Sequence, residues 1–272
     1  MSLSFHRGVT MPAVAGVSDV SLRAATTAGP DPVEVYGVPL HPLTMAQTVE
    51  RVEALVADGG PHQHVVLNAA KVVQLRDDPA LREIVRSCAL VNADGQAVVW
   101  GARLLGADVP ERVTGIDLFD RLLDRAAELG WSVYFLGATE EVVRQVVELQ
   151  HSVRPALRIA GWRNGYWTAG EEPAVVAAVA AAKPTLLFVA MPTPRKEFFL
   201  AQHLEALDVP FAMGVGGSFD ILAGITRRAP GWMQRAGLEW MYRLLQEPRR
   251  MFRRYLVGNV RFILITLGEK LR

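Results

Sequence analysis

Hydrophobic and polar positions along the chain switch repeatedly between two periodicities. Short apolar, β-branched runs predict strands, and longer stretches with apolar residues three and four positions apart predict helices. The predicted strands span residues 33–40, 64–67, 89–92, 132–136, 157–160, 185–190 and 210–215. The predicted helices span residues 43–57, 69–76, 81–87, 95–106, 116–129, 140–150, 171–182 and 197–207. Gly130 follows one of these helices and is expected to be its C-cap.

Strands that alternate with helices, and that read as continuous apolar runs later in the chain, are typical of a mostly parallel sheet flanked by helices. We therefore predict a Rossmann-like α/β domain over residues 33–226. Residues 1–32 are rich in small residues and lack the layout of a signal peptide, and we expect them to form a flexible N-terminal tail.

Residues 227–272 form a basic C-terminal appendage that the overall net charge of +1 hides. They hold 11 Lys and Arg against 3 Asp and Glu, whereas the other 226 residues hold 18 against 25. Two short amphipathic helices separated at Pro248 are expected here. One apolar stripe at four-residue spacing is formed by Trp232, Ala236, Trp240 and Leu244. This pattern favours docking on a membrane surface, with a solvated terminal helix pair and a nucleic-acid-binding segment as the alternatives.

Other features of the composition exclude several classes of protein. The most apolar run, residues 262–267, is far shorter than the roughly 20 residues of a membrane-spanning helix. Cys88 is the only cysteine, so an internal disulfide is excluded and a reducing cytoplasm fits. His62 and His64 form the only close histidine pair, and no Cys, Asp or Glu supports them as metal ligands. We therefore predict no metal site.

Ligands of parallel sheets bind beyond the carboxyl ends of the strands, and two of the loops there are glycine-rich. Residues 135–139 read FLGAT around Gly137, and residues 214–220 read GVGGSFD with Gly216, Gly217 and Asp220. Glycines let backbone N–H groups approach phosphate oxygens, and Asp220 would accept hydrogen bonds from a ribose or a base. The alternative is that these glycines only permit tight turns. Neither loop is a Walker A or a GxGxxG motif, but together they favour nucleotide binding.

Asp94 is the strongest catalytic candidate, because it ends a predicted strand in the sequence VNADG. A carboxylate at that edge of the sheet is able to take a proton from an attacking hydroxyl. The local pattern alone favours a simpler role, in which Asp94 is the N-cap of the following helix.

Six segments of the chain resemble the WecG/TagA/CpsF family of bacterial glycosyltransferases, in consistent order from about residue 33 to 271. They are VLNAAKVV (66–73), VNADGQAVVW (91–100), PERVTGIDLF (110–119), NGYW (164–167), GVGGSFDILAG (214–224) and RAPGWMQRAGLEWMYRLLQEPRRMFRRYL (228–256). The resemblance implies an inverting enzyme that transfers a sugar, often N-acetylmannosamine, from a UDP-sugar to an undecaprenyl-diphosphate-linked sugar. It implies a role in cell-wall or exopolysaccharide synthesis, a peripheral position on the cytoplasmic face of the membrane, and no cofactor or nucleic-acid partner.

The resemblance also assigns roles to single residues. Asp94 matches the proposed general base, which reverses the preference for an N-cap. Asn68 and Arg112 match polar positions of the active-site pocket. Asp220 matches the acidic residue near the nucleoside, and Tyr166 lies in a pocket loop.

Arginines of the appendage match residues that are thought to close over the site. They are Arg243, Arg250 and Arg253. The family has no DxD metal motif and neither has this chain, so arginine would have to stabilise the departing UDP diphosphate.

Two positions depart from the family pattern. Val66 stands where a threonine is usual. Residues 191–197 read MPTPRKE, with Lys196 in place of a glutamine. An ammonium donates hydrogen bonds but cannot accept them. Lys196 remains a candidate site residue, and a carboxylated donor such as a UDP-uronate becomes an alternative to an N-acetylmannosamine-type or related hexose donor.

Two further functions are open to a chain of this pattern. A non-catalytic nucleotide-binding module that docks on membranes would keep the glycine loops without needing Asp94. A dehydrogenase would need the glycine fingerprint followed by an acid about 20 residues later, which is missing. The appendage would also allow a homo-oligomer. Neither the sugars, the linkage nor the polymer follows from the sequence.

Overall fold

The computed structural model describes residues 29–271 apart from 236 and 247, and the side chains of residues 235, 243 and 248–257 are outside the described part. Its centre is a six-stranded sheet in which every neighbouring pair is parallel. In spatial order the strands are β4 (Leu90–Ala93), β3 (His62–Leu67), β8 (Phe211–Gly214), β7 (Leu186–Ala190), β5 (Ser132–Gly137) and β6 (Arg158–Arg163). The predicted α/β fold is confirmed.

The central strands are buried on both faces, which explains their continuous apolar sequences. In β7, Leu186 and Phe188 pack into the core on one face, whereas Leu187 and Val189 pack into the core on the other. The edge strand β6 has no fully buried residue.

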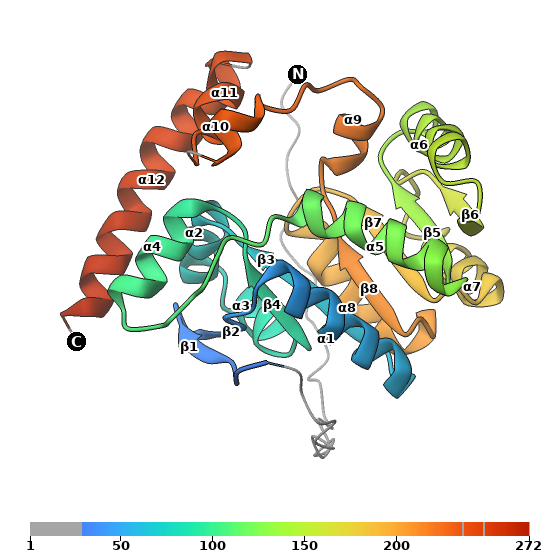
Figure 1. Cartoon of the computed structure of the whole chain (residues 1–272), viewed down its shortest axis with the longest axis horizontal. Coiled ribbons are helices and arrows are strands. Elements are labelled where there is room, and N and C mark those ends of the chain that lie inside the picture. The colour runs from blue at the N-terminus through green and yellow to red at the C-terminus, as the bar shows by residue number, and fades with distance from the viewer. Residues whose placement is uncertain (1–28, 236, 247, 272) are drawn as a thin grey trace.

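Helices cover both faces of this sheet (Figure 1). On one face α1 (Met45–Asp58) packs beside α5 (Gly115–Leu129), and α6 (Glu140–Val153) packs beside α9 (Ser218–Leu222). On the other face α3 (Pro79–Arg86) and α7 (Glu172–Ala182) both pack against α8 (Arg195–Leu207). Beside them lie α2 (Ala69–Asp77) and α4 (Gln96–Leu104). As predicted, Gly130 ends α5 in the left-handed conformation, with φ of 68°.

The appendage differs from its prediction. It contains α10 (Gly231–Arg235), α11 (Glu239–Gln246) and α12 (Pro248–Lys270), and α12 is a helix of 23 residues rather than a short one. Pro248 does begin a new helix, as expected. The predicted apolar stripe is wrong, because Gly237 adopts φ of 72° between α10 and α11. Trp232 and Trp240 therefore lie on different helices, while residue 236 is outside the described part.

The C-terminal half of α12 belongs to the core on one side. It packs on α2 and α4, and its Phe262 is only 5% exposed. The ring of Phe262 lies 5.6 Å from that of Tyr36, which is in the turn between β1 (Val33–Val35) and β2 (Val38–Leu40). The two short strands form an antiparallel hairpin.

Polar contacts reinforce this packing. The hydroxyl of Tyr36 lies 3.1 Å from that of Thr266, and its backbone N–H donates to Glu269 at 3.2 Å. Glu269 also pairs with Arg76 of α2 at 2.8 Å. Burial, the largest effect, raises the pKa of Tyr36 to about 12. No helix in the described part of the chain, α12 included, is long and apolar enough to cross a membrane.

Candidate active site

Backbone hydrogen bonds gather three of the predicted site residues at the carboxyl edge of the sheet. The N–H of Asp94 donates to the carbonyl of Leu67 at 2.8 Å, so Asp94 lies beside Asn68, the next residue along. The N–H of Val113 donates to the carbonyl of Ala93 at 3.0 Å, which brings the preceding residue, Arg112, to the same place. Asn68, Asp94 and Arg112 thus come together from three separate loops.

Asp94 is not the N-cap of α4. That position is occupied by Gly95, with φ of 131°, so the simpler role predicted from the local pattern is wrong. Asp94 is half-buried. Its neighbour Asn68 does cap a helix, because its side-chain oxygen accepts from the N–H of Lys71 at 3.0 Å at the start of α2.

Arg112 connects this group to the appendage. Its guanidinium donates to Glu239 at 2.8 Å through Nη1 and to the backbone carbonyl of Gln234 at 3.1 Å through Nη2. The turn between α10 and α11 also lies against the start of α4, because a Cβ on Gly237 would come within 2.9 Å of the Cβ of Gln96. The appendage therefore covers the edge of the sheet next to Asp94.

Lys196 lies in a buried ionic cluster. Its ammonium contacts the hydroxyl of Thr193 and lies 2.8 Å from Glu197, which also pairs with Lys71 at 2.5 Å. Burial alone would raise the pKa of Glu197, but Lys71 and Lys196 outweigh it and hold that pKa below its usual value. Lys196 is 6% exposed and packs against Gly214 at the end of β8. To contact a substrate, Lys196 would have to leave this cluster.

The glycine loop after β8 lies at the middle of the same edge. Gly216 adopts φ of 54°, and Gly217 is exposed. Asp220 follows in the first turn of α9, where its backbone carbonyl accepts from Ile225 and Thr226. The loop is therefore a tight turn, as the alternative interpretation required, and it faces the side of the sheet where ligands bind.

Gly137 and Tyr166 lie at the far end of the edge. A Cβ on Gly137 would come within 2.4 Å of the Ala190 carbonyl oxygen, so the close approach of β7 by itself requires glycine there. Tyr166 is 69% exposed, and its N–H donates to the side chain of Asn164 at 2.9 Å. Because neighbouring strands lie about 4.8 Å apart and β5 is four strands from β4, Gly137 is roughly 19 Å from Asp94 along this edge.

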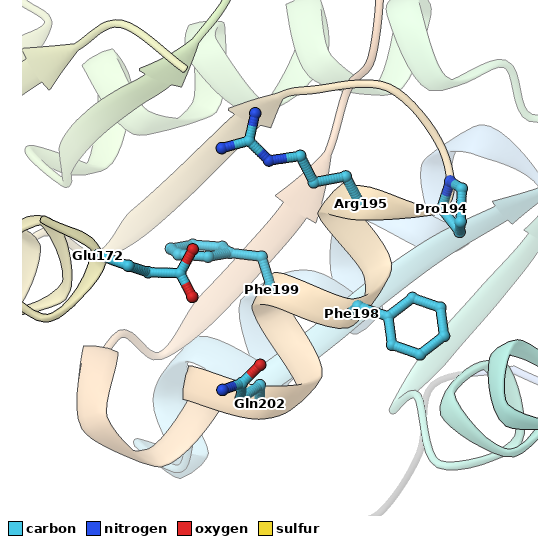
Figure 2. A pocket seen from close by; sticks show the side chains of 6 residues that line it. All are labelled: Glu172, Pro194, Arg195, Phe198, Phe199 and Gln202. Carbon is cyan, nitrogen blue, oxygen red and sulfur yellow. The ribbon is translucent and has the colours of Figure 1, made fainter. Parts of the chain in front are cut away.

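A groove of about 350 Å³ runs along α8, and the sequence had not pointed to it. Its lining residues are Glu172, Pro194, Arg195, Phe198, Phe199 and Gln202 (Figure 2). Arg195 donates to the carbonyl of Gly165 at 2.9 Å and lies 4.7 Å from the centre of the Trp167 ring. These contacts hold the loop that carries Tyr166. The Arg195 position was visible in the MPTPRKE segment, but its partner 30 residues upstream was not.

Three predicted site residues fall where side chains are not described. Arg243 lies in α11, and Arg250 and Arg253 lie in the first half of α12. The described residues contain no group of three or more His, Cys, Asp or Glu that could hold a metal ion. His64 is instead a buried residue of β3, 3.0 Å from Asn92, and burial lowers its pKa to about 3.

Comparison with known proteins identifies relatives of the chain. Residues 33–272 match the glycosyl transferase WecG/TagA/CpsF family. A protein of Bacillus spizizenii, N-acetylglucosaminyldiphosphoundecaprenol N-acetyl-beta-D-mannosaminyltransferase, is 36% identical over 173 residues. That match spans 64% of this chain and 66% of the relative.

Proposed function

Because this chain belongs to the WecG/TagA/CpsF family of glycosyltransferases, we propose that it moves a sugar from a UDP-sugar to a sugar carried on undecaprenyl diphosphate. The observation that carries the proposal is the position of Asp94. It directly follows β4 at the ligand edge of the sheet, precedes Gly95 at the N-cap position of α4, and lies beside Asn68 and Arg112.

The proposed reaction inverts the anomeric centre. Asp94 takes the proton of the acceptor hydroxyl, whose oxygen attacks the anomeric carbon of the donor. The bond from that carbon to UDP breaks at the same time, and its electron pair goes to the diphosphate oxygen. Preorganised positive charge is what such a leaving group needs. Arg112 would supply part of it, and the appendage would supply the rest through Arg243, Arg250 and Arg253.

The donor sugar is proposed to be of the N-acetylmannosamine type. The printed activity of the Bacillus relative, an N-acetylmannosaminyl transfer to N-acetylglucosaminyldiphosphoundecaprenol, supports both this donor and this acceptor. A UDP-uronate donor would need Lys196 to bind the sugar carboxylate. Since the Lys196 ammonium is buried against Thr193 and Glu197, we do not assign it that role. Tyr166 and Asp220 are proposed to flank the nucleoside, with Gly216 and Gly217 near the diphosphate.

The lipid-linked acceptor implies that the enzyme works at the inner face of the cell membrane. Exposed apolar side chains are concentrated in the appendage. They include Trp232, Trp240, Leu245, Val260, Ile263, Leu264 and Leu267. Together with the excess of arginine there, they support a peripheral attachment to the cytoplasmic surface.

The test is an assay of UDP release from candidate UDP-sugars, with and without a polyprenyl-diphosphate sugar acceptor. We expect Asp94→Asn to lower kcat by about 10²–10⁴-fold, the usual contribution of a general base, while UDP affinity stays within a few-fold. The matched control is Asp78→Asn, since Asp78 does cap a helix, α3, through the N–H of Leu81. Equal, near wild-type turnover of both variants would remove Asp94 from catalysis. UDP binding by the wild-type chain without any sugar transfer would favour the non-catalytic nucleotide-binding module.

Metal independence is a second expectation for the same assay. Arginine, and not a divalent ion, is proposed to neutralise the diphosphate, so activity should persist in excess EDTA. Loss of activity that Mg²⁺ or Mn²⁺ restores would contradict this part of the proposal.

A further inference from the structure

Four charged side chains tie the beginning of the appendage to the core. Two come from the core, Arg112 before α5 and Asp117 in its first turn. The other two come from the appendage, Arg228 and Glu239. Arg228 forms a bidentate ion pair with Asp117, in which Nη1 and Nη2 lie 2.6 and 2.8 Å from the two carboxylate oxygens. A bidentate pair of this kind fixes orientation as well as distance.

Asp117 is itself held in place by Thr114, the N-cap of α5. Burial alone would raise the pKa of Asp117, but hydrogen bonds from Arg228 and Thr114 outweigh it and hold that pKa below its usual value. Asp117 therefore remains ionised, and it gives the appendage a fixed anchor at one end.

Glu239 is the carboxylate that two arginines share. Its Oε2 accepts from Nη1 of Arg112 at 2.8 Å, and its Oε1 lies 3.4 Å from Nε of Arg228. Its side chain is 25% exposed, so solvent screens these contacts less than it would at the open surface. Without Glu239, Arg112 would lose its carboxylate partner, and of the four charged side chains only Asp117, which Arg228 binds, would still attract it.

We propose that Glu239 is a positioning residue for the transfer reaction, which holds the Arg112 guanidinium beside Asp94 so that it faces the leaving diphosphate. This inference rests on the function proposed above. Its support is geometric. The backbone N–H of Val113 donates to the backbone carbonyl of Ala93, so the residues next to them, Arg112 and Asp94, are neighbours.

The hydrogen bonds that Arg112 donates to the appendage leave some of its N–H groups available to a ligand. A guanidinium carries five N–H donors, and the bonds to Glu239 and to the Gln234 carbonyl use only part of them. Through Glu239 and the Gln234 carbonyl, the appendage thus orients the guanidinium of Arg112.

The experiment compares Glu239→Gln with Glu269→Gln. Glu269 also connects the appendage to the core, through Arg76 and the Tyr36 N–H, but it lies at the C-terminal end of α12, whereas Glu239 begins α11. We expect Glu239→Gln to lower kcat about ten- to hundredfold and to weaken UDP binding, with the acceptor KM unchanged. Glu269→Gln should lower thermal stability and leave kcat and UDP affinity near wild type.

A double-mutant cycle separates positioning from a general loss of structure. If Glu239 acts through Arg112, Arg112→Lys combined with Glu239→Gln should lose no more than Arg112→Lys alone. Additive losses, or an equal loss of kcat in Glu269→Gln, would overturn the proposal. Should Glu239→Gln fail to fold, Glu239→Asp keeps the charge while moving the carboxylate back, and it should lower kcat without abolishing it.

The UDP dissociation constant keeps the two proposals apart. A chain that binds UDP but transfers no sugar would contradict the proposed function, and an effect of Glu239→Gln on UDP affinity would still be measurable. Unchanged UDP affinity in a folded Glu239→Gln variant would contradict the role of Glu239 alone.

Discussion

His41 lies buried directly after β2 and is held there as a neutral imidazole. Its ring Nδ1 accepts from the backbone N–H of Val91 at 3.1 Å, and the backbone N–H of His41 donates to the Val91 carbonyl at 2.9 Å. Burial, assisted by the nearby charge of Arg51, lowers the pKa of His41 to about 4. An unfolded histidine titrates near pH 6.5, so between these values the unfolded chain binds a proton that the native chain does not.

We therefore expect no loss of unfolding free energy from His41 above about pH 6.5. Between about pH 6.5 and 4 the unfolding free energy should fall as the pH decreases. The loss at pH 4.5 should be about 2 to 3 kcal/mol, from ~1.4 kcal/mol for each unit of pKa shift. Urea unfolding between pH 7.5 and 4.5 measures it. His41→Asn keeps an acceptor for Val91 and cannot be protonated, so its stability should fall less steeply. Identical slopes in both proteins would contradict this assignment.

At the residue scale the sequence pointed to Asp94 as a candidate, because its position after a short strand is visible in VNADG. The resemblance, rather than any local pattern, pointed to Asn68 and Arg112. Glu239 was missed because its partner Arg112 is 127 residues upstream, and no local spacing shows such a pair. Lys196 stays a predicted site residue, but the sequence did not show that its side chain is buried against Thr193 and Glu197.

Helix α12 presents two different faces to its surroundings. Phe262 and Thr266 face the core, whereas Ile263 and Leu264 are 54% and 63% exposed. Residues next to one another in the sequence therefore have different roles, which follows from the helical period.

Truncating these side chains should separate the two faces. Phe262→Ala should cost about 3–5 kcal/mol of unfolding free energy, because it opens a cavity against the ring of Tyr36. Leu264→Ala, the matched exposed change, should alter stability by less than about 0.5 kcal/mol. Chemical denaturation measures both, and equal effects would mean that α12 does not pack on the core in this way.

Among the elements, the sheet and the helices over it were predictable because each has a strong period of its own. The C-cap at Gly130 also follows from a local signal. Residues 33–40 were predicted as one strand, but they form the two short strands β1 and β2, with Tyr36 in the turn between them. The appendage was not predictable in the same way. The turn at Gly237 breaks a four-residue stripe that looks continuous, and α12 runs on to Lys270 where contacts with α2 and α4 support it.

The molecule as a whole is electrically polarised, since residues 227–272 carry a net charge of +8 and the other 226 residues a net charge of −7. We expect the full chain to bind vesicles that contain anionic lipid better than neutral vesicles. Each arginine near the surface contributes about 1 kcal/mol, and the attraction weakens as salt shortens the Debye length to about 8–10 Å. Vesicle co-sedimentation over a salt series measures this.

A pair of double variants controls for net charge in that experiment. Replacing Arg249 and Arg254 of the appendage by Ala should weaken vesicle binding. Replacing the exposed Arg121 and Arg144 of the core by Ala removes the same charge and should have little effect. Equal losses would show that the net charge matters and its location does not.

The contact between Tyr36 and α12 sets the order in which the chain can finish folding during synthesis. Thr266 follows Tyr36 by 230 residues, so at about 5–20 residues per second the ribosome adds it roughly 10 to 50 s later. Until then the core around Tyr36 lacks Phe262 and keeps apolar surface exposed. The hairpin, α2 and α4 therefore lack their contacts with α12 during this interval, and a nascent chain stalled before residue 262 would expose the apolar surface that Phe262 covers in the complete chain.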